Sequence, residues 1–120
     1  GAGKGQRRNL NIPLPHGATD DEIIGAWKDI LLPELEKQEF KPDMVLISAG
    51  FDSREEDPLG TFRITDDGFA RLTEMALGIA HTHCAGKLVS VLEGGYNTRG
   101  LASAVCRHVE ILLHLPKPMQ

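Results

Sequence analysis

Two residues with complementary chemistry follow the two most apolar runs of the sequence. Asp52 comes after the run at 44–48, and Tyr96 comes after the run at 87–92. An aspartate can ligate a metal, act as a base or orient a histidine. A tyrosine can donate a hydrogen bond to a developing oxyanion. The pair suits metal-assisted hydrolysis of a carbonyl, but one carboxylate cannot hold a zinc ion, because catalytic zinc sites use three protein ligands.

The loops that carry these residues have unusual compositions. Residues 48–60 contain two glycines, a proline, an arginine and several acids. The second loop places Gly94 and Gly95 directly before Tyr96, which lets the backbone approach another group closely and frees the tyrosine to point outward. The alternative interpretation is a tight turn with a surface tyrosine.

Periodicity predicts the elements that position the two loops. We expect an edge strand or an irregular one at 9–15, because of its two prolines. After it we expect a helix from a capping box at Thr19, a strand at 44–48, a helix capped by Thr65, a strand at 87–92 and a helix at about 98–115. This β-α-β-α-β-α order is typical of an α/β fold with parallel strands. If the two apolar strands are neighbours, their carboxyl ends bring Asp52 and Tyr96 to one cleft.

Several finer features follow from the same patterns. The two strong strands are apolar without alternation, which favours helices on both faces of the sheet. Pro33 is expected to break or kink the first helix, although a new turn can start there. His81 and His83 diverge on a helix, and His108 and His114 are expected on a helix surface. We expect both cysteines, Cys84 and Cys106, to be buried and reduced.

Composition indicates one soluble domain over residues 1–120. The chain is 41% hydrophobic and 25% charged, with a net charge of -4, so nothing in it supports nucleic-acid binding. We expect no membrane span and no signal peptide, and therefore a cytoplasmic protein. The glycine-rich start at 1–8 lacks the strand that precedes a phosphate loop, so a flexible connection is expected there.

The loop motifs resemble those of the zinc-dependent histone deacetylase family. The residues that carry the resemblance are SAGFD at 48–52, DPLG at 57–60 and LEGGYN at 92–97, with weaker matches at 9–15 and 41–43. The similarity is greatest to class II and acetylpolyamine amidohydrolase-like members. It implies an arginase/deacetylase fold, a three-layer arrangement of a parallel sheet and flanking helices. Residues 1–120 would form its partial, C-terminal half.

The resemblance also implies roles for individual residues. Asp52 matches a zinc-binding aspartate, and Tyr96 matches the tyrosine that hydrogen-bonds the substrate carbonyl. Leu59 matches a residue that lines the acyl-lysine tunnel, and Gly94 and Gly95 match the glycines that let the tunnel form.

The rim of this site is expected to depart from the pattern. Arg54 stands where many class II members have a histidine. Glu55, Glu56 and Asp57 are interpreted as loop structure and solvated charge, with an acidic rim that recognises a cationic substrate as the weaker alternative.

The family's Asp-x-His zinc motif and its paired histidines, which include the general base, do not occur in these 120 residues. We therefore expect a deacetylase-like segment, acting on acetylated lysine or polyamine amines, that is inactive as an isolated chain. Zinc belongs to the complete family site, and this chain alone is expected to hold none. The alternative is a non-catalytic structural or binding module derived from a truncated deacetylase.

The expected partner follows from the unpaired strand edges and uncovered faces of half a sheet. We expect either a homo-oligomer or a missing N-terminal half that covers these surfaces.

Overall fold

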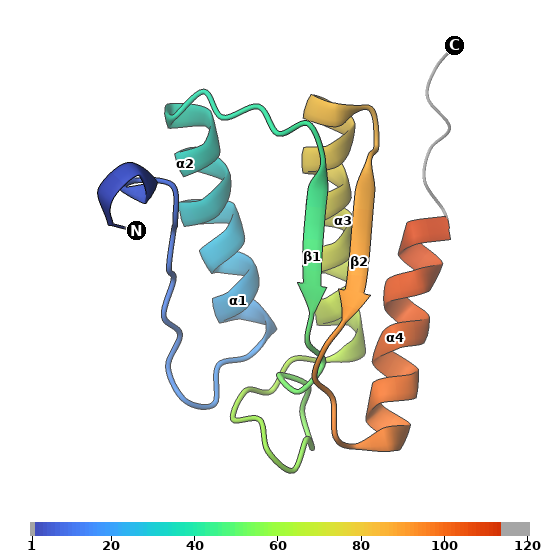
Figure 1. The fold of residues 1–120 in the computed structure, drawn as a ribbon. Coiled ribbons are helices and arrows are strands. Elements are labelled where there is room, and N and C mark those ends of the chain that lie inside the picture. The colour runs from blue at the N-terminus through green and yellow to red at the C-terminus, as the bar shows by residue number, and fades with distance from the viewer. Residues whose placement is uncertain (1, 114–120) are drawn as a thin grey trace.

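The computed structural model describes residues 2–113 of the 120. Its elements run in the order η1 (Gly3–Gly5), α1 (Asp20–Ala26), η2 (Trp27–Leu31), α2 (Leu32–Lys37), β1 (Val45–Ala49), α3 (Asp66–Cys84), β2 (Leu88–Leu92) and α4 (Thr98–Leu113). The α/β character predicted from the sequence is confirmed (Figure 1). None of these helices is long and apolar enough to cross a bilayer.

The first helix starts where the capping box predicts and continues through Pro33. The Glu22 carboxylate accepts the Thr19 backbone N–H at 2.7 Å, which satisfies one of the exposed donors at the helix start. The chain stays helical at Pro33, and α2 begins at Leu32 with Pro33 in its first turn, as the alternative of a new turn predicts. Before it, η2 is a π-helical turn, in which the N–H of Leu32 reaches the carbonyl of Trp27. This wider turn lies directly before Pro33, which has no N–H to donate.

The predicted edge strand at 9–15 is wrong, because these residues form no strand. Pro13 and Pro15 lack the N–H groups that a ladder requires. Pairing begins just beyond them, where Gly17 donates to the Thr61 carbonyl at 2.9 Å. The element order therefore begins with helices, and the β-α-β-α-β-α prediction loses its first strand.

The sheet of the described residues contains two parallel strands, β1 and β2. Val45 pairs with Leu88 at one end, and Ala49 pairs with Leu92 at the other. The two apolar strands are parallel, as predicted, and they are neighbours, which was the condition for bringing their loops to one cleft. Their carboxyl ends lie in register, so the loops that follow them start side by side (Figure 1).

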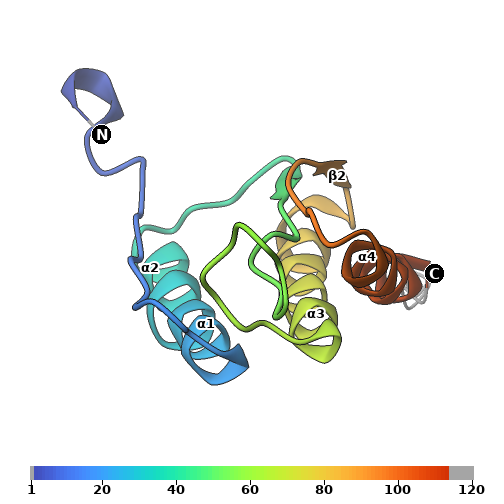
Figure 2. The ribbon, with the colours of Figure 1, turned by 90° about the horizontal axis from the view of Figure 1, so that it is seen from below.

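Only one face of this sheet is covered by helices of the described chain. Helices α3 and α4 lie behind the two strands, and nothing described lies in front of them (Figures 1 and 2). On the open face Leu46 is 73% exposed, and its cross-strand neighbour Val89 and the nearby Val91 are also exposed. The expectation of helices on both faces is therefore wrong for residues 2–113.

The hydrophobic core lies at the carboxyl end of β1, between the sheet, α3 and α4. Its buried members are Ala49, Phe51, Ile64, Phe69 and Ala104. The rings of Phe51 and Phe69 have centroids 5.0 Å apart, a favourable tilted aromatic contact. Because Phe51 directly precedes Asp52, core packing anchors the first loop at its base.

Two predictions about single helix residues are corrected by this packing. His108, expected on a helix surface, is only 7% exposed and bonds Thr73 and Ser90. Cys84 is buried as expected, but Cys106 is exposed. The stripe that α4 buries therefore includes the histidine and excludes that cysteine. His114 lies outside the described residues.

Candidate active site

The two loops stay paired beyond the ends of the strands. The Glu93 N–H donates to the Ala49 carbonyl at 3.0 Å, and the Phe51 N–H donates to the Gly94 carbonyl at 2.8 Å. These bonds extend the parallel ladder by one step on each side. They hold the residue before Asp52 against the residues before Tyr96.

The Asp52 carboxylate lies against the backbone of Gly94. A Cβ atom added at Gly94 would come within 2.7–2.8 Å of three atoms of that carboxylate, closer than non-bonded carbon and oxygen atoms can approach. Asp52 itself is half-buried. The close backbone approach predicted from the glycine pair is therefore real, and the group approached is the candidate metal ligand.

Gly95 has a separate requirement. Its φ of +140° lies where residues with a Cβ are strained, and a Cβ there would lie 2.7 Å from Leu101 Cδ1. The next residue, Tyr96, is 54% exposed. The tyrosine thus leaves the loop toward solvent, as the glycine pair predicts.

Asp57 joins the first loop to the second. One carboxylate oxygen accepts the N–H groups of Leu59 and Gly60 at 2.8 and 2.9 Å, and the other accepts the Tyr96 N–H at 2.8 Å. Partial burial opposes ionisation of this group, but the bonds from the Tyr96, Gly60 and Leu59 N–H groups outweigh it and lower the Asp57 pKa. The prediction of a structural role for Asp57 is confirmed, but its link to Tyr96 was missed.

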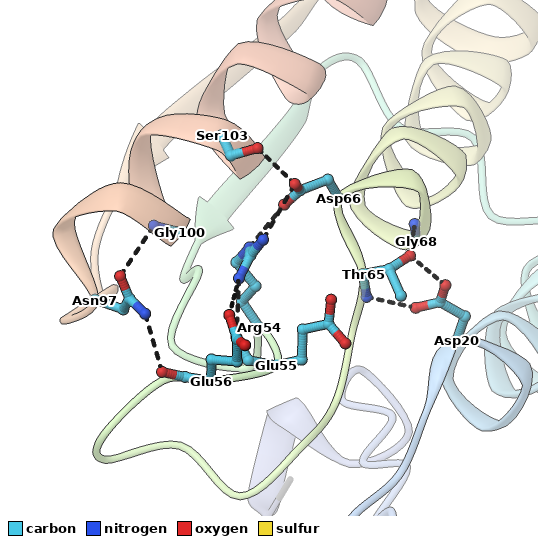
Figure 3. Close-up of polar contacts among 10 residues, drawn as sticks. All are labelled: Asp20, Arg54, Glu55, Glu56, Thr65, Asp66, Gly68, Asn97, Gly100 and Ser103. Atoms are coloured by element: carbon cyan, nitrogen blue, oxygen red, sulfur yellow. Dashed lines mark hydrogen bonds and ion pairs between the residues drawn. The ribbon is translucent and has the colours of Figure 1, made fainter.

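Arg54 points inward, not to the rim of the site. Its Nε and Nη2 atoms donate to the two carboxylate oxygens of Asp66 at 2.7 and 3.2 Å (Figure 3). The bond from Arg54 lowers the Asp66 pKa, and the bond from Asp66 raises the Arg54 pKa. This partly buried pair directs the guanidinium toward α3, and Nη1 also lies 3.7 Å from the exposed Glu56 carboxylate. Whether the rim departs from the family pattern stays a prediction.

The helix that carries Asp66 is itself fixed at its start. Thr65 accepts the Gly68 N–H at 3.1 Å with its side chain, which confirms the predicted cap. Asp20 of α1 in turn accepts the Thr65 N–H and hydroxyl at 2.8 and 2.6 Å (Figure 3). The starts of α1 and α3 are therefore bonded together beside the first loop.

The donor set of the described chain does not make a zinc site by itself. Within residues 2–113 there is no group of three or more His, Cys, Asp or Glu side chains placed to hold a metal. Asp52 offers one carboxylate, whereas a catalytic zinc needs three protein ligands. Leu59, which the resemblance places in a substrate tunnel, is 68% exposed at the loop.

A separate open cleft of about 910 Å³ lies between residues 6–10 and residues 31–40. None of the predicted site residues lines it. Its acid and one of its cations, Glu34 and Lys37, form an ion pair with each other at 3.7 Å along α2, so we place the candidate site at the paired loops.

Comparison with known proteins gives the family. A model of the histone deacetylase domain matches residues 1–112. A probable deacetylase of Archaeoglobus fulgidus is 41% identical over 100 residues, which are 83% of this chain and 27% of that protein. The polyamine deacetylase HDAC10 of Danio rerio is 41% identical over 119 residues, 98% of this chain and 17% of that protein.

Solved structures agree with these relatives. The HDA15 HD domain matches with a TM-score of 0.85 and 34% identity over 100% of this chain and 32% of its own. The histone deacetylase Clr3 matches with a TM-score of 0.85 and 33% identity over 99% of this chain and 19% of its own. The chain thus spans less than a third of each of these four proteins. The match over residues 1–112, together with motif loops that lie side by side in space, shows that this chain belongs to the histone deacetylase family.

Proposed function

We propose that this chain supplies Asp52 and Tyr96 to a site that hydrolyses the acetyl amide of lysine or polyamine amines. The remaining metal ligands and the general base would come from polypeptide outside these 120 residues. Asp52 would serve as one metal ligand, and Tyr96 as the donor to the carbonyl oxygen. On this proposal the isolated chain is inactive, and a cytoplasmic location stays a prediction.

The observation that carries the proposal is the joint fixing of the two loops. Asp52 rests on Gly94, two residues before Tyr96, while Asp57 bonds the Tyr96 N–H at 2.8 Å. These contacts fix the Asp52 carboxylate relative to the backbone that carries the Tyr96 phenol. Preorganised donors cost no reorganisation when charge develops, which is the main source of electrostatic catalysis.

The roles divide according to what each side chain can do. The phenol of Tyr96 is exposed, so a substrate carbonyl can reach it and accept its hydrogen bond. The Asp52 carboxylate has a fixed neighbour in Gly94 and contributes negative charge to a cation site. Zinc, once bound by a complete ligand set, would polarise the amide carbonyl and lower the pKa of a bound water.

Two substrate classes are compatible with the relatives. One relative is named a polyamine deacetylase and others are named histone deacetylases. Both classes present an acetylated primary amine on a flexible chain. We therefore propose the acetylated amine as the common substrate feature.

The test measures zinc content and deacetylation by the purified 120-residue chain, alone and mixed with a separately made N-terminal half of a homologous deacetylase domain. The substrates are an acetyl-lysine peptide and an N-acetylated polyamine. We expect neither zinc nor turnover from the chain alone, and both from the mixture. Stoichiometric zinc with turnover in the isolated chain would refute the claim that it is incomplete, and a mixture that assembles but neither binds zinc nor turns over would refute the proposed role.

Two variants separate the roles within that mixture. Asp52→Asn should abolish zinc retention, because it removes a ligand charge. Tyr96→Phe should keep zinc and lose most turnover, by roughly 100-fold or more if the phenol acts as an oxyanion donor. Equal zinc loss in both variants would show that Tyr96 acts on the metal site and not on the carbonyl.

The open sheet face favours a second candidate, a non-catalytic module that associates with copies of itself. Each strand pairs only with the other among the described residues, and Leu46 and Val89 are exposed side by side. Exposed apolar patches and free strand edges commonly mark association surfaces. Light scattering should then show dimers or larger species that Leu46→Lys converts to monomer. A monomer at high concentration would exclude this candidate.

A further inference from the structure

We propose that Arg54 and Gly100 are positioning residues that together fix Tyr96 relative to Asp52. The inference rests on the proposed function for the roles of those two side chains. It concerns a part of the chain that the family resemblance leaves without a role, because Arg54 departs from the pattern that many class II members share.

The Arg54 side chain is held rigidly. It is 12% exposed and forms a two-pronged ion pair with Asp66 at 2.7 and 3.2 Å. Its Nη1 atom also donates to the Glu55 carbonyl at 3.0 Å. Ser103 of α4 donates to the same Asp66 carboxylate (Figure 3). A guanidinium with this many fixed partners has one orientation, since two parallel bonds add geometric specificity.

That guanidinium passes directly over the first turn of α4. A Cβ at Gly100 would lie 2.9 Å from Arg54 Nη1 and 3.2 Å from its Cδ. The arginine therefore sets how closely α4 can approach the first loop, and glycine is the residue that permits this approach. Gly100 also donates its N–H to the Asn97 side chain at 3.0 Å.

Asn97 connects the position of α4 to Tyr96, its neighbour in sequence. Its side-chain amide donates to the Glu56 carbonyl at 3.1 Å (Figure 3), so the second loop is bonded to the first one here as well as through Asp57. On the other side, the Arg54 N–H closes the turn around Asp52 by donating to the Phe51 carbonyl at 3.1 Å. One residue thus fixes the Asp52 turn with its backbone and α4 with its side chain.

A second arginine offers a matched comparison. Arg107 also joins α3 to α4, because it bonds Asp67 at 2.9 Å and is paired with Glu110 at 2.8 Å. Its bonds lie on the exposed side of the two helices and involve neither loop. If Arg54 only held the helices together, changing either arginine would have the same effect on Tyr96.

The experiment uses hydrogen exchange and proton NMR of the 120-residue chain. The chain has a single tyrosine, so its ring signals report on Tyr96 alone. The test variants are Arg54→Lys and Gly100→Ala. The matched controls are Arg107→Lys and Gly78→Ala, because a Cβ at Gly78 meets nothing within 4 Å.

We expect each test variant to speed exchange of the Tyr96 amide by about fivefold, the factor for loss of one typical hydrogen bond. The Tyr96 ring signals should shift as well. The exchange rates of amides in the α3 core should stay within twofold of those in the original chain. In both control variants the Tyr96 amide should also exchange within twofold of its original rate, and the ring signals should not shift. In the double variant the combined effect should be smaller than the sum of the two single effects, because lysine has no Nη1 atom to meet the new Cβ.

Unchanged Tyr96 exchange and ring signals in Arg54→Lys would overturn the inference, even if Gly100→Ala failed to fold. Equal changes in Arg107→Lys would overturn it as well, because the effect would then be general loosening of α3 against α4. These readouts need neither metal nor substrate. Absence of deacetylation in the assembled form would therefore count against the proposed function while leaving this result standing.

Discussion

His108→Leu tests whether a buried polar contact, which no sequence pattern indicated, stabilises the core beneath the site. Thr73 donates its only hydroxyl hydrogen to the Phe69 carbonyl at 2.6 Å. Its oxygen must therefore accept from Nδ1 of His108, 2.7 Å away. Burial lowers the His108 pKa and so favours the neutral ring, whose other nitrogen, Nε2, accepts from the Ser90 hydroxyl at 2.9 Å. The histidine is neutral, with the hydrogen on Nδ1.

The expected loss in the free energy of unfolding follows from the hydrogen bonds that leucine cannot form. Both bonds disappear, at a net cost of about 1 kcal/mol each. Thr73 keeps its bond to the Phe69 carbonyl, and half-buried Ser90 can turn to water, so neither is orphaned. Leucine still packs on Phe51, whose ring centroid lies 5.7 Å from that of the histidine. We expect a loss of about 2 kcal/mol, a large share of the stability of a small domain.

Urea unfolding at pH 7.5, followed by the fluorescence of the single tryptophan, Trp27, measures this loss. His83→Leu is the control, because His83 is exposed at the end of α3. It should change the free energy of unfolding by less than about 0.5 kcal/mol. A His108→Leu chain as stable as the original would refute the hydrogen-bond assignment.

The same histidine predicts a pH dependence. Burial lowers the His108 pKa below its usual 6.5, so the unfolded chain binds a proton at a pH where the folded chain does not. The stabilisation is complete above pH 6.5 and is lost as the pH falls below that value toward the lowered pKa, with a limiting slope of about 1.4 kcal/mol per pH unit. The gap in stability between the original chain and His108→Leu should therefore narrow between pH 7.5 and 5. A constant gap would contradict the assignment.

Three further predictions concern the site and its supports. Gly94→Ala should displace the Asp52 carboxylate by roughly 0.7 Å or more and weaken zinc retention at least about tenfold in the assembled form, as measured by competition with a chelator. Asp20→Ala should cost about 1–2 kcal/mol in urea unfolding, because the N-cap of α3 loses two hydrogen bonds. A thiol reagent should label exposed Cys106 quickly and buried Cys84 only on unfolding. Equal labelling rates would contradict the burial of Cys84.

Local chemistry made part of the fold predictable. The capping residues Thr19 and Thr65 mark the helix starts correctly, because a cap is satisfied within four residues and needs no distant partner. The position of Asp52 and Tyr96 at one sheet edge also followed from sequence, since parallel strands share the direction of their carboxyl ends. Gly94 was predictable as a close-approach position, although the group approached was not.

Long-range partners were not predictable in the same way. The partner of Arg54 is 12 residues away, and that of His108 through Thr73 is 35 residues away. Either side chain in isolation is typical of a surface. The apolar patterns of β1 and β2 also led to a wrong expectation, namely that helices cover both faces of the sheet. An apolar side chain indicates a surface that is suited to burial, but it does not show that the described residues supply the cover. Leu46 is the clearest case.

These corrections connect the core to the candidate site. His108 packs against Phe51, and Phe51 sets the base of the loop that carries Asp52. Arg54 then fixes α4 against that loop, and Asp57 bonds the N–H of Tyr96. The core therefore reaches the site through a short series of direct contacts. Because catalysis depends on placement to within a fraction of an ångström, changes in this series should alter the candidate site before they unfold the chain.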